Sequence, residues 1–198
     1  MRLALAGNAL LVVAGLLTGQ LAGAGTIEGR VQKGGLDADL SNFVLSLEDI
    51  QGPFPPPVEL AVMDQKELRF VPHLLVIQVG TTVEFPNSDL VSHNVFSISD
   101  AKRFNLGLYS RGTVRRIKFD KPGVVKLLCN VHLEMSAYIV VLKNPYFART
   151  GADGTFRIPN VPAGRHRLRC WHERLEAKEQ EIEIPTTGTI QVVFDMGW

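Results

Sequence analysis

The loop Cys129-Asn130-Val131-His132-Leu133-Glu134-Met135 organises the sequence, because it places three candidate metal ligands between two strand-like segments, 124–128 and 137–142. Its Cys-x2-His-x2-Met spacing offers a thiolate, an imidazole and a thioether. Sulfur ligands with imidazole suit copper, and a trigonal His2Cys set with a long axial Met is typical of copper sites that transfer electrons. His93 can supply the second histidine from upstream. The sequence therefore predicts one copper ion held by His93, Cys129, His132 and Met135.

Other interpretations of these residues remain open. Buried Cys and Met side chains often serve only for packing. Zinc is the main chemical rival, although structural zinc sites favour more Cys and His ligands and no thioether. A catalytic pair of Cys129 and His132 would need a third, orienting group nearby. Cys129 and Cys170 could also form a disulfide in an exported protein, and that bond would remove Cys129 from the metal.

Further polar residues lie near these ligands or repeat their chemistry. Asn94 follows His93, and we expect its side chain to hydrogen-bond across to the Cys129 loop and hold it in place. His166, Cys170 and His172 share one face of a strand and could form a second metal site. Side chains spread along a strand converge on one ion only awkwardly, so we expect Cys170 to pack inside and His172 to be a polar edge residue.

The composition favours an all-β protein with no nucleic-acid partner. The chain has 21 basic and 20 acidic residues, whereas an obligate nucleic-acid binder shows a concentrated basic footprint. Its 18 Gly and 11 Pro are scattered among Val, Ile and Thr, and no segment has an apolar period of helix length. A local basic group could steer an acidic partner, although a solvated strand face is the preferred interpretation. That group comprises Arg111, Arg115, Arg116, Lys118 and Lys121.

The N-terminal segment 1–24 is typical of a secretory signal peptide. Arg2 precedes a largely apolar run from Leu3 to Leu17, and Ala22-Gly23-Ala24 suits cleavage. The run is short for a membrane span, although an uncleaved anchor remains an alternative. We therefore expect an exported, periplasmic protein without a stable membrane span after cleavage.

The Pro-rich stretch from Gly52 to Pro57 marks a boundary between domains. It separates residues 25–57 from a series of short strands over 58–142, and the chain changes character again over 143–198. Within 58–142 we expect strands at 58–63, 74–79 and 113–119, with a longer and partly irregular connection at 99–112.

Residues 58–142 resemble the cupredoxins of the plastocyanin and amicyanin type. The resemblance rests on Phe70-Val71-Pro72, the run from Ile77 to Asn87, His93-Asn94-Val95, Gly123 and the Cys129–Met135 loop. The short ligand spacing is similar to that of amicyanin. Val131 departs from the pattern, because those proteins usually place Pro two residues after the cysteine.

This resemblance implies a Greek-key β-sandwich with one type 1 copper ion on His93, Cys129, His132 and Met135, and with His132 as the solvent-side electron port. It implies an electron carrier rather than an enzyme. The partner would be an unidentified redox protein, such as a dehydrogenase or a cytochrome. The layout also resembles exported cupredoxin-like proteins named for methylamine utilisation. Two alternatives remain: copper binding and delivery without electron shuttling, and a partner-docking sandwich with an accessory copper site.

The flanking segments resemble a second kind of domain. Thr150–Ile158, Val161–Gly164 and Arg165–Leu168 are similar to a carboxypeptidase regulatory-like, or transthyretin-like, β-sandwich. Gly25–Val31 resembles the first strand of such a domain. We therefore expect residues 25–57 and 143–198 to form one small sandwich, with the copper domain inserted between its strands.

Overall fold

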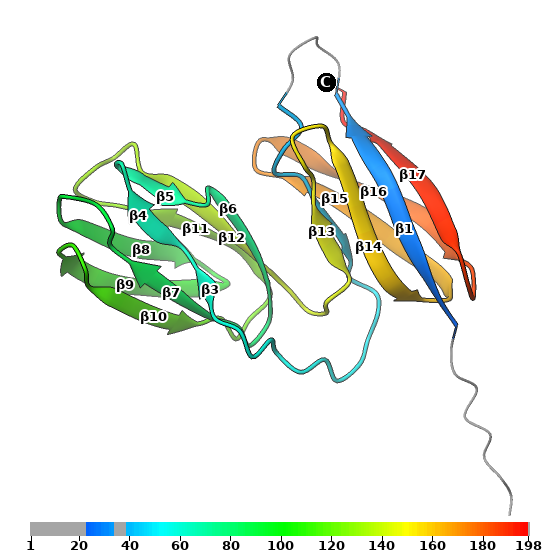
Figure 1. The fold of residues 1–198 in the computed structure, drawn as a ribbon, viewed down its shortest axis with the longest axis horizontal. Helices are drawn as coiled ribbons and strands as arrows, with labels where there is room; N and C mark the ends of the chain where they lie inside the picture. The colour runs from blue at the N-terminus through cyan, green and yellow to red at the C-terminus, as the bar shows by residue number, and fades with distance from the viewer. Residues whose placement is uncertain (1–22, 34–38, 198) are drawn as a thin grey trace, which may run out of the picture.

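The computed structural model describes residues 23–33 and 39–197, and Figure 1 shows two β-sandwiches lying side by side. Every regular element of these residues is a strand, which confirms the predicted all-β class. No helix in the described part of the chain is long and apolar enough to cross a membrane. Most of the predicted signal peptide lies outside the described residues, and Ala24 already begins strand β1.

The first sandwich contains the central part of the chain. Its larger sheet has the order β6-β12-β11-β8-β9, made of β6 (Leu74–Gln78), β12 (Ser136–Leu142), β11 (Gly123–Leu128), β8 (His93–Ser99) and β9 (Lys102–Tyr109). The smaller sheet has the order β10-β7-β3, made of β10 (Val114–Lys118), β7 (Thr82–Pro86) and β3 (Ala61–Val62). A separate hairpin joins β4 (Asp64–Lys66) to β5 (Arg69–Val71).

Alternating apolar residues build the core between these sheets. On β7, Val83 and Phe85 are fully buried while Glu84 between them faces outward, as the two-residue period of a strand requires. Phe119 and Leu127 are also fully buried in this core. Cys129 and Met135 belong to the same cluster, so both sulfur atoms are held at one end of a packed interior.

Two segments of the first sandwich differ from the sequence-based expectation. The connection at 99–112 was expected to be irregular, but most of it is strand β9, whose Phe104 and Leu106 pack against the core. The alternation of Phe104, Leu106 and Leu108 was the available signal for this strand. A register shift in the pairing of β8 with β9, together with Gly107 at φ 71°, buries Tyr109 in place of Leu108. The strand expected at 58–63 is reduced to β3, and residues 58–60 are not part of it.

The second sandwich combines both ends of the described chain. One sheet has the order β14-β1-β17, made of β14 (Thr155–Pro162), β1 (Ala24–Gln32) and β17 (Thr189–Asp195). The other has the order β13-β2-β15-β16, made of β13 (Phe147–Arg149), β2 (Val44–Leu47), β15 (Gly164–His172) and β16 (Leu175–Ile184). Ile27 pairs with Ile158 on one side and with Ile190 on the other. The domain boundaries at 57/58 and 142/143 stay a prediction.

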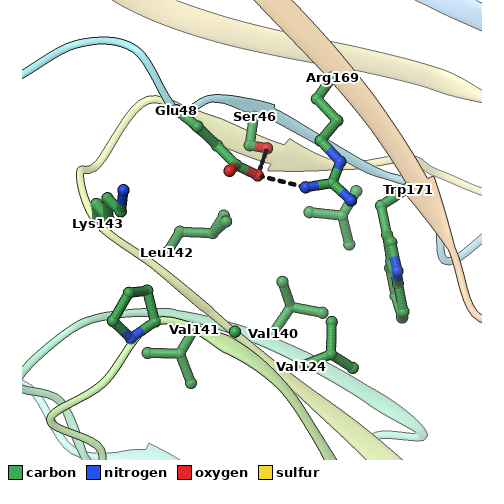
Figure 2. Close-up of a pocket in the computed structure, with 12 residues that line it drawn as sticks. Ser46, Glu48, Val124, Val140, Val141, Leu142, Lys143, Arg169 and Trp171 are labelled. Atoms are coloured by element: carbon green, nitrogen blue, oxygen red, sulfur yellow. Dashed lines mark hydrogen bonds and ion pairs between the residues drawn. The ribbon is translucent and has the colours of Figure 1, made fainter. Parts of the chain in front are cut away.

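An apolar junction joins the two sandwiches. Val44 of β2 is buried in one cluster with Leu74 and Val140 of the first sandwich, and Tyr138 meets Trp171 with ring centroids 6.1 Å apart. A cavity of about 100 Å³ remains at this junction, and Figure 2 shows its apolar floor beneath the Glu48–Arg169 ion pair. The two sandwiches therefore contact each other through apolar side chains of β2, β6 and β12.

Candidate metal centre

Three of the four predicted ligands meet at one end of the first sandwich. The donor atoms of His93, Cys129 and His132 all lie within 4.8 Å of one another. The Nδ1 atoms of His93 and His132 are 3.0 Å apart, and their rings meet at an angle of 64°. The predicted cluster of one thiol and two imidazoles therefore exists in the folded chain.

Strand pairing explains why these residues meet. β11 runs antiparallel to β8 beside it in the sheet, so the end of β11 lies near the start of β8, where His93 stands. The loop that follows β11 carries Cys129 and His132 and leads into β12. Within the loop, the Met135 amide donates to the carbonyl of His132 at 3.0 Å, which closes a tight turn.

Three of the four predicted ligands are buried, and the fourth reaches solvent. His93, Cys129 and Met135 are 0%, 2% and 1% exposed, whereas His132 is partly exposed. Beside His132, Leu133 is 85% exposed. A bound ion would therefore be shielded from water, and the His132 ring would be the ligand that connects it to the protein surface.

The donor set fits a copper ion. Two imidazole nitrogens that bind one first-row metal ion at about 2.0 Å each lie about 3 Å apart, which agrees with the Nδ1–Nδ1 separation. A thiol beside two imidazoles supplies the soft sulfur and nitrogen ligands that copper prefers. Met135 is buried in the same core cluster as Cys129, and its role as axial ligand stays a prediction.

Asp89 is a component of the site that the sequence analysis missed. Its Oδ2 atom lies 2.9 Å from His93 Nε2, the ring nitrogen that faces away from His132. The carboxylate also accepts hydrogen bonds from the amides of Leu68 and Leu90, each at 2.7 Å. The hydrogen bond from the Leu68 amide is the main cause that lowers the pKa of Asp89. The hydrogen bonds from His93 and from the Leu90 amide lower this pKa further. The sequence contained one signal for this contact, because the acidic residue Asp89 lies four positions before His93.

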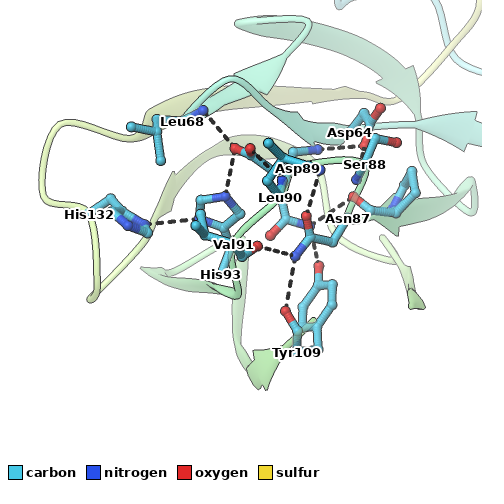
Figure 3. A network of polar contacts seen from close by, with 12 residues as sticks. Asp64, Leu68, Asn87, Ser88, Asp89, Leu90, Val91, His93, Tyr109 and His132 are labelled. Carbon is cyan, nitrogen blue, oxygen red and sulfur yellow. Dashed lines mark hydrogen bonds and ion pairs between the residues drawn. The ribbon is translucent and has the colours of Figure 1, made fainter. Parts of the chain in front are cut away.

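A polar network holds the Asp89 turn, as Figure 3 shows. The Asn87 side chain accepts from the Asp89 amide at 2.9 Å and donates to the carbonyls of Val91 and Tyr109. The Tyr109 hydroxyl donates to the Phe85 carbonyl at 3.1 Å, and burial raises the pKa of Tyr109 to about 12. The turn before His93 is therefore anchored to both sheets.

Asn94 does not make the contact that the sequence analysis expected. Its side-chain amide donates to Asn105 of β9 at 2.7 Å rather than to the Cys129 loop, and its Oδ1 atom is buried without a hydrogen-bond partner. The reason is strand pairing: Asn94 lies opposite Leu108, next to the irregular register between β8 and β9. The hydrogen bond of Asn94 therefore joins β8 to the neighbouring strand β9 and not to the ligand loop.

The remaining candidate residues lie in other surroundings. Cys129 and Cys170 are both free, so the alternative of a disulfide between them is wrong. Cys170 is fully buried in the core of the second sandwich, His166 contacts Asp49 at 3.3 Å, and His172 stacks on Phe43.

Within residues 23–33 and 39–197, the cluster of His93, Cys129 and His132 is the one group of this kind that could hold a metal ion.

Comparisons with known proteins agree with this assignment. Residues 57–142 match the family of copper binding proteins described as the plastocyanin/azurin family. A purple cupredoxin from Nitrosopumilus maritimus is 29% identical with a TM-score of 0.38, over 41% of this chain and 98% of that one. A Cu(I) form of an amicyanin variant is 20% identical with a TM-score of 0.39, over 41% and 81%. The comparison with curated proteins finds no significant match.

A copper-containing nitrite reductase from Thermus scotoductus is also similar. It is 26% identical with a TM-score of 0.42, over 57% of this chain and 28% of that one. The family match concerns the same residues that carry the cluster of one thiol and two imidazoles. Residues 57–142 are therefore similar to the copper binding proteins of the plastocyanin/azurin family, and copper is the cofactor of this centre.

Proposed function

We propose that this protein is an exported electron carrier that passes single electrons through one type 1 copper centre, with His93, Cys129, His132 and Met135 as ligands. The observation that carries the proposal is the convergence of the first three donor groups within 4.8 Å in a buried site. When bound, copper supplies a one-electron couple between Cu(II) and Cu(I). The protein is not an enzyme in this proposal.

The chain favours electron transfer by holding the ligands still. His93 begins β8, and the loop that carries Cys129 and His132 is short and anchored by strands at both ends. A buried, close-packed interior resists rearrangement. The side chains therefore need to move little when the charge of the centre changes.

The surface near His132 supports docking of a redox protein. Leu133 and Leu90 are 85% and 81% exposed, and Val131 and Leu68 are about half exposed. Figure 3 places Leu68 and Leu90 at the same end of the sandwich as His132. An exposed group of apolar side chains marks a site of interaction. The proposed partner is an unidentified dehydrogenase or cytochrome, met in the periplasm.

The basic group, three of whose five residues lie on β10, contributes less to this proposal. Arg116 pairs with Glu84, and Lys118 lies 3.7 Å from Asp120. Arg115 lies over the ring of Tyr109, 5.9 Å from its centroid. These contacts favour a solvated strand face over a steering surface.

The visible spectrum tests the proposed function. Copper-loaded protein should show an intense absorption band that disappears on reduction and returns on oxidation. Cys129→Ser should abolish the band, while the matched variant Cys170→Ser, altered at the buried thiol of the other sandwich, should keep it. A colourless Cu(II) complex, or a band that survives Cys129→Ser, would overturn the proposal. Tight binding without colour would favour copper delivery instead.

A further inference from the structure

We propose that Asp89 is a positioning residue that fixes the tautomer of His93 and lowers the reduction potential of the copper centre. This inference rests on the proposed function and extends it to a residue that does not touch the metal. The observation behind it is the 2.9 Å contact between Asp89 Oδ2 and His93 Nε2, in a place where the imidazole is fully buried.

The tautomer follows from the chemistry of the contact. A carboxylate accepts hydrogen bonds and cannot donate them, so the proton of a neutral His93 lies on Nε2. The Nδ1 lone pair then faces His132 and the shared centre. A partner of this type orients a metal-binding imidazole and raises its basicity. Asp89 therefore prepares His93 for the metal before any metal binds.

The charge of Asp89 acts on the centre through the same contact. The side chain is 11% exposed, so water screens it only weakly. A fixed negative charge stabilises the more positive state of a nearby ion, and Cu(II) carries one more charge than Cu(I). Asp89 therefore favours the oxidised state and shifts the potential downward.

The fold holds Asp89 in place with unusual backbone geometry. Its carboxylate accepts the amide of Leu68 at the tip of the β4–β5 hairpin. The turn residues Glu67 and Leu68 have φ angles of 53° and 59°, a left-handed region that residues with a side chain seldom adopt. Positive φ at both residues is the geometry of a type I′ turn, which here joins the paired residues Lys66 and Arg69. The hairpin tip thus places a donor on the carboxylate.

The decisive variant is Asp89→Asn, which keeps an acceptor oxygen and removes the charge. The variant should bind copper and keep the visible band, while its potential rises. We expect the ratio of Cu(I) to Cu(II) affinity to increase about tenfold, equivalent to about 59 mV for one electron. The control is Glu134→Gln, the same carboxylate-to-amide change at an exposed position of the ligand loop. It should shift the potential much less.

A second measurement needs no copper. Nitrogen NMR of the metal-free protein should show His93 protonated at Nε2, and Asp89→Leu should redistribute the proton between the two ring nitrogens. Protonation of His93 at Nδ1 in the wild-type protein would overturn the inference even if Asp89→Asn fails to fold. An unchanged potential in Asp89→Asn would overturn it as well. A wild-type protein without the visible band would instead contradict the proposed function. The NMR measurement of the His93 tautomer in the metal-free protein would still test the role of Asp89.

Discussion

Leu128, the last residue of β11, pairs with Phe96 on β8, and this pairing brings the Cys129 loop beside the strand that begins with His93. The centre therefore depends on a contact between distant segments of chain. The ligands are presented by a sheet whose register is set by the buried residues on its inner face, because a slip of one residue would turn that face outward.

Replacing Met135 by Leu should leave copper bound and change the reduction potential. A weak axial ligand tunes the potential of such sites without holding the metal by itself. The swap conserves volume, so the free energy of unfolding should change by less than about 1.5 kcal/mol. Voltammetry with thermal unfolding checks both values. Met63→Leu, at a fully buried position in the same core, is the matched control and should leave the potential unchanged.

Alkaline pH should destabilise the protein through Cys170. Burial raises the pKa of this thiol from 9.0 to about 12. A raised pKa in the folded state means that the stabilisation is complete below about pH 9 and is lost as the pH rises towards 12. The loss is at most about 1.4 kcal/mol per pH unit for one group. Denaturant unfolding across this range measures it.

Cys170→Ala separates this effect from that of Tyr109, whose pKa is also raised to about 12. The variant should show a shallower loss of stability between pH 9 and 12 than the wild-type protein. Equal slopes for the two proteins would contradict the assignment to Cys170.

Leu68→Gly should stabilise the hairpin next to the copper centre. A left-handed conformation costs a residue with a side chain about 1–2 kcal/mol, and Leu68 has a φ of 59°. The greater freedom of glycine in the unfolded chain offsets about 0.4–1 kcal/mol. A net gain between zero and about 1.6 kcal/mol is expected from denaturant unfolding. Leu133→Gly, at an exposed position without positive φ, should give no gain.

Trp171→Ala should weaken the junction between the sandwiches. The indole packs against Tyr138 and the apolar junction cluster but is only partly buried. We expect a loss of about 1–3 kcal/mol, below the value for a fully buried Trp. The visible spectrum should stay unchanged, because Trp171 contacts the outer face of the sheet and not the ligand loop. A spectral change would show that the junction influences the centre.

Much of the copper domain could be predicted from local signals. The Cys-x2-His-x2-Met spacing and the strand-like segments on either side identify the loop without any knowledge of the fold. Alternation of buried and exposed residues, as at Val83, Glu84 and Phe85, is visible in the chain itself. The same alternation is present in β9 at Phe104, Leu106 and Leu108. The sequence did not show that a register shift beside Gly107 buries Tyr109 in place of Leu108.

The amino-acid sequence by itself determined the all-β class and the chemistry of the donor set, because both depend on residue types at short spacing. Only the tertiary structure decided which residues surround those donors. Asp89 reaches His93 through a turn, Leu68 reaches Asp89 through a hairpin, and Asn94 turns to Asn105 instead of the Cys129 loop. Contacts of this kind follow from strand register and turn geometry, and these are set by packing across the whole sandwich rather than by neighbours in the chain.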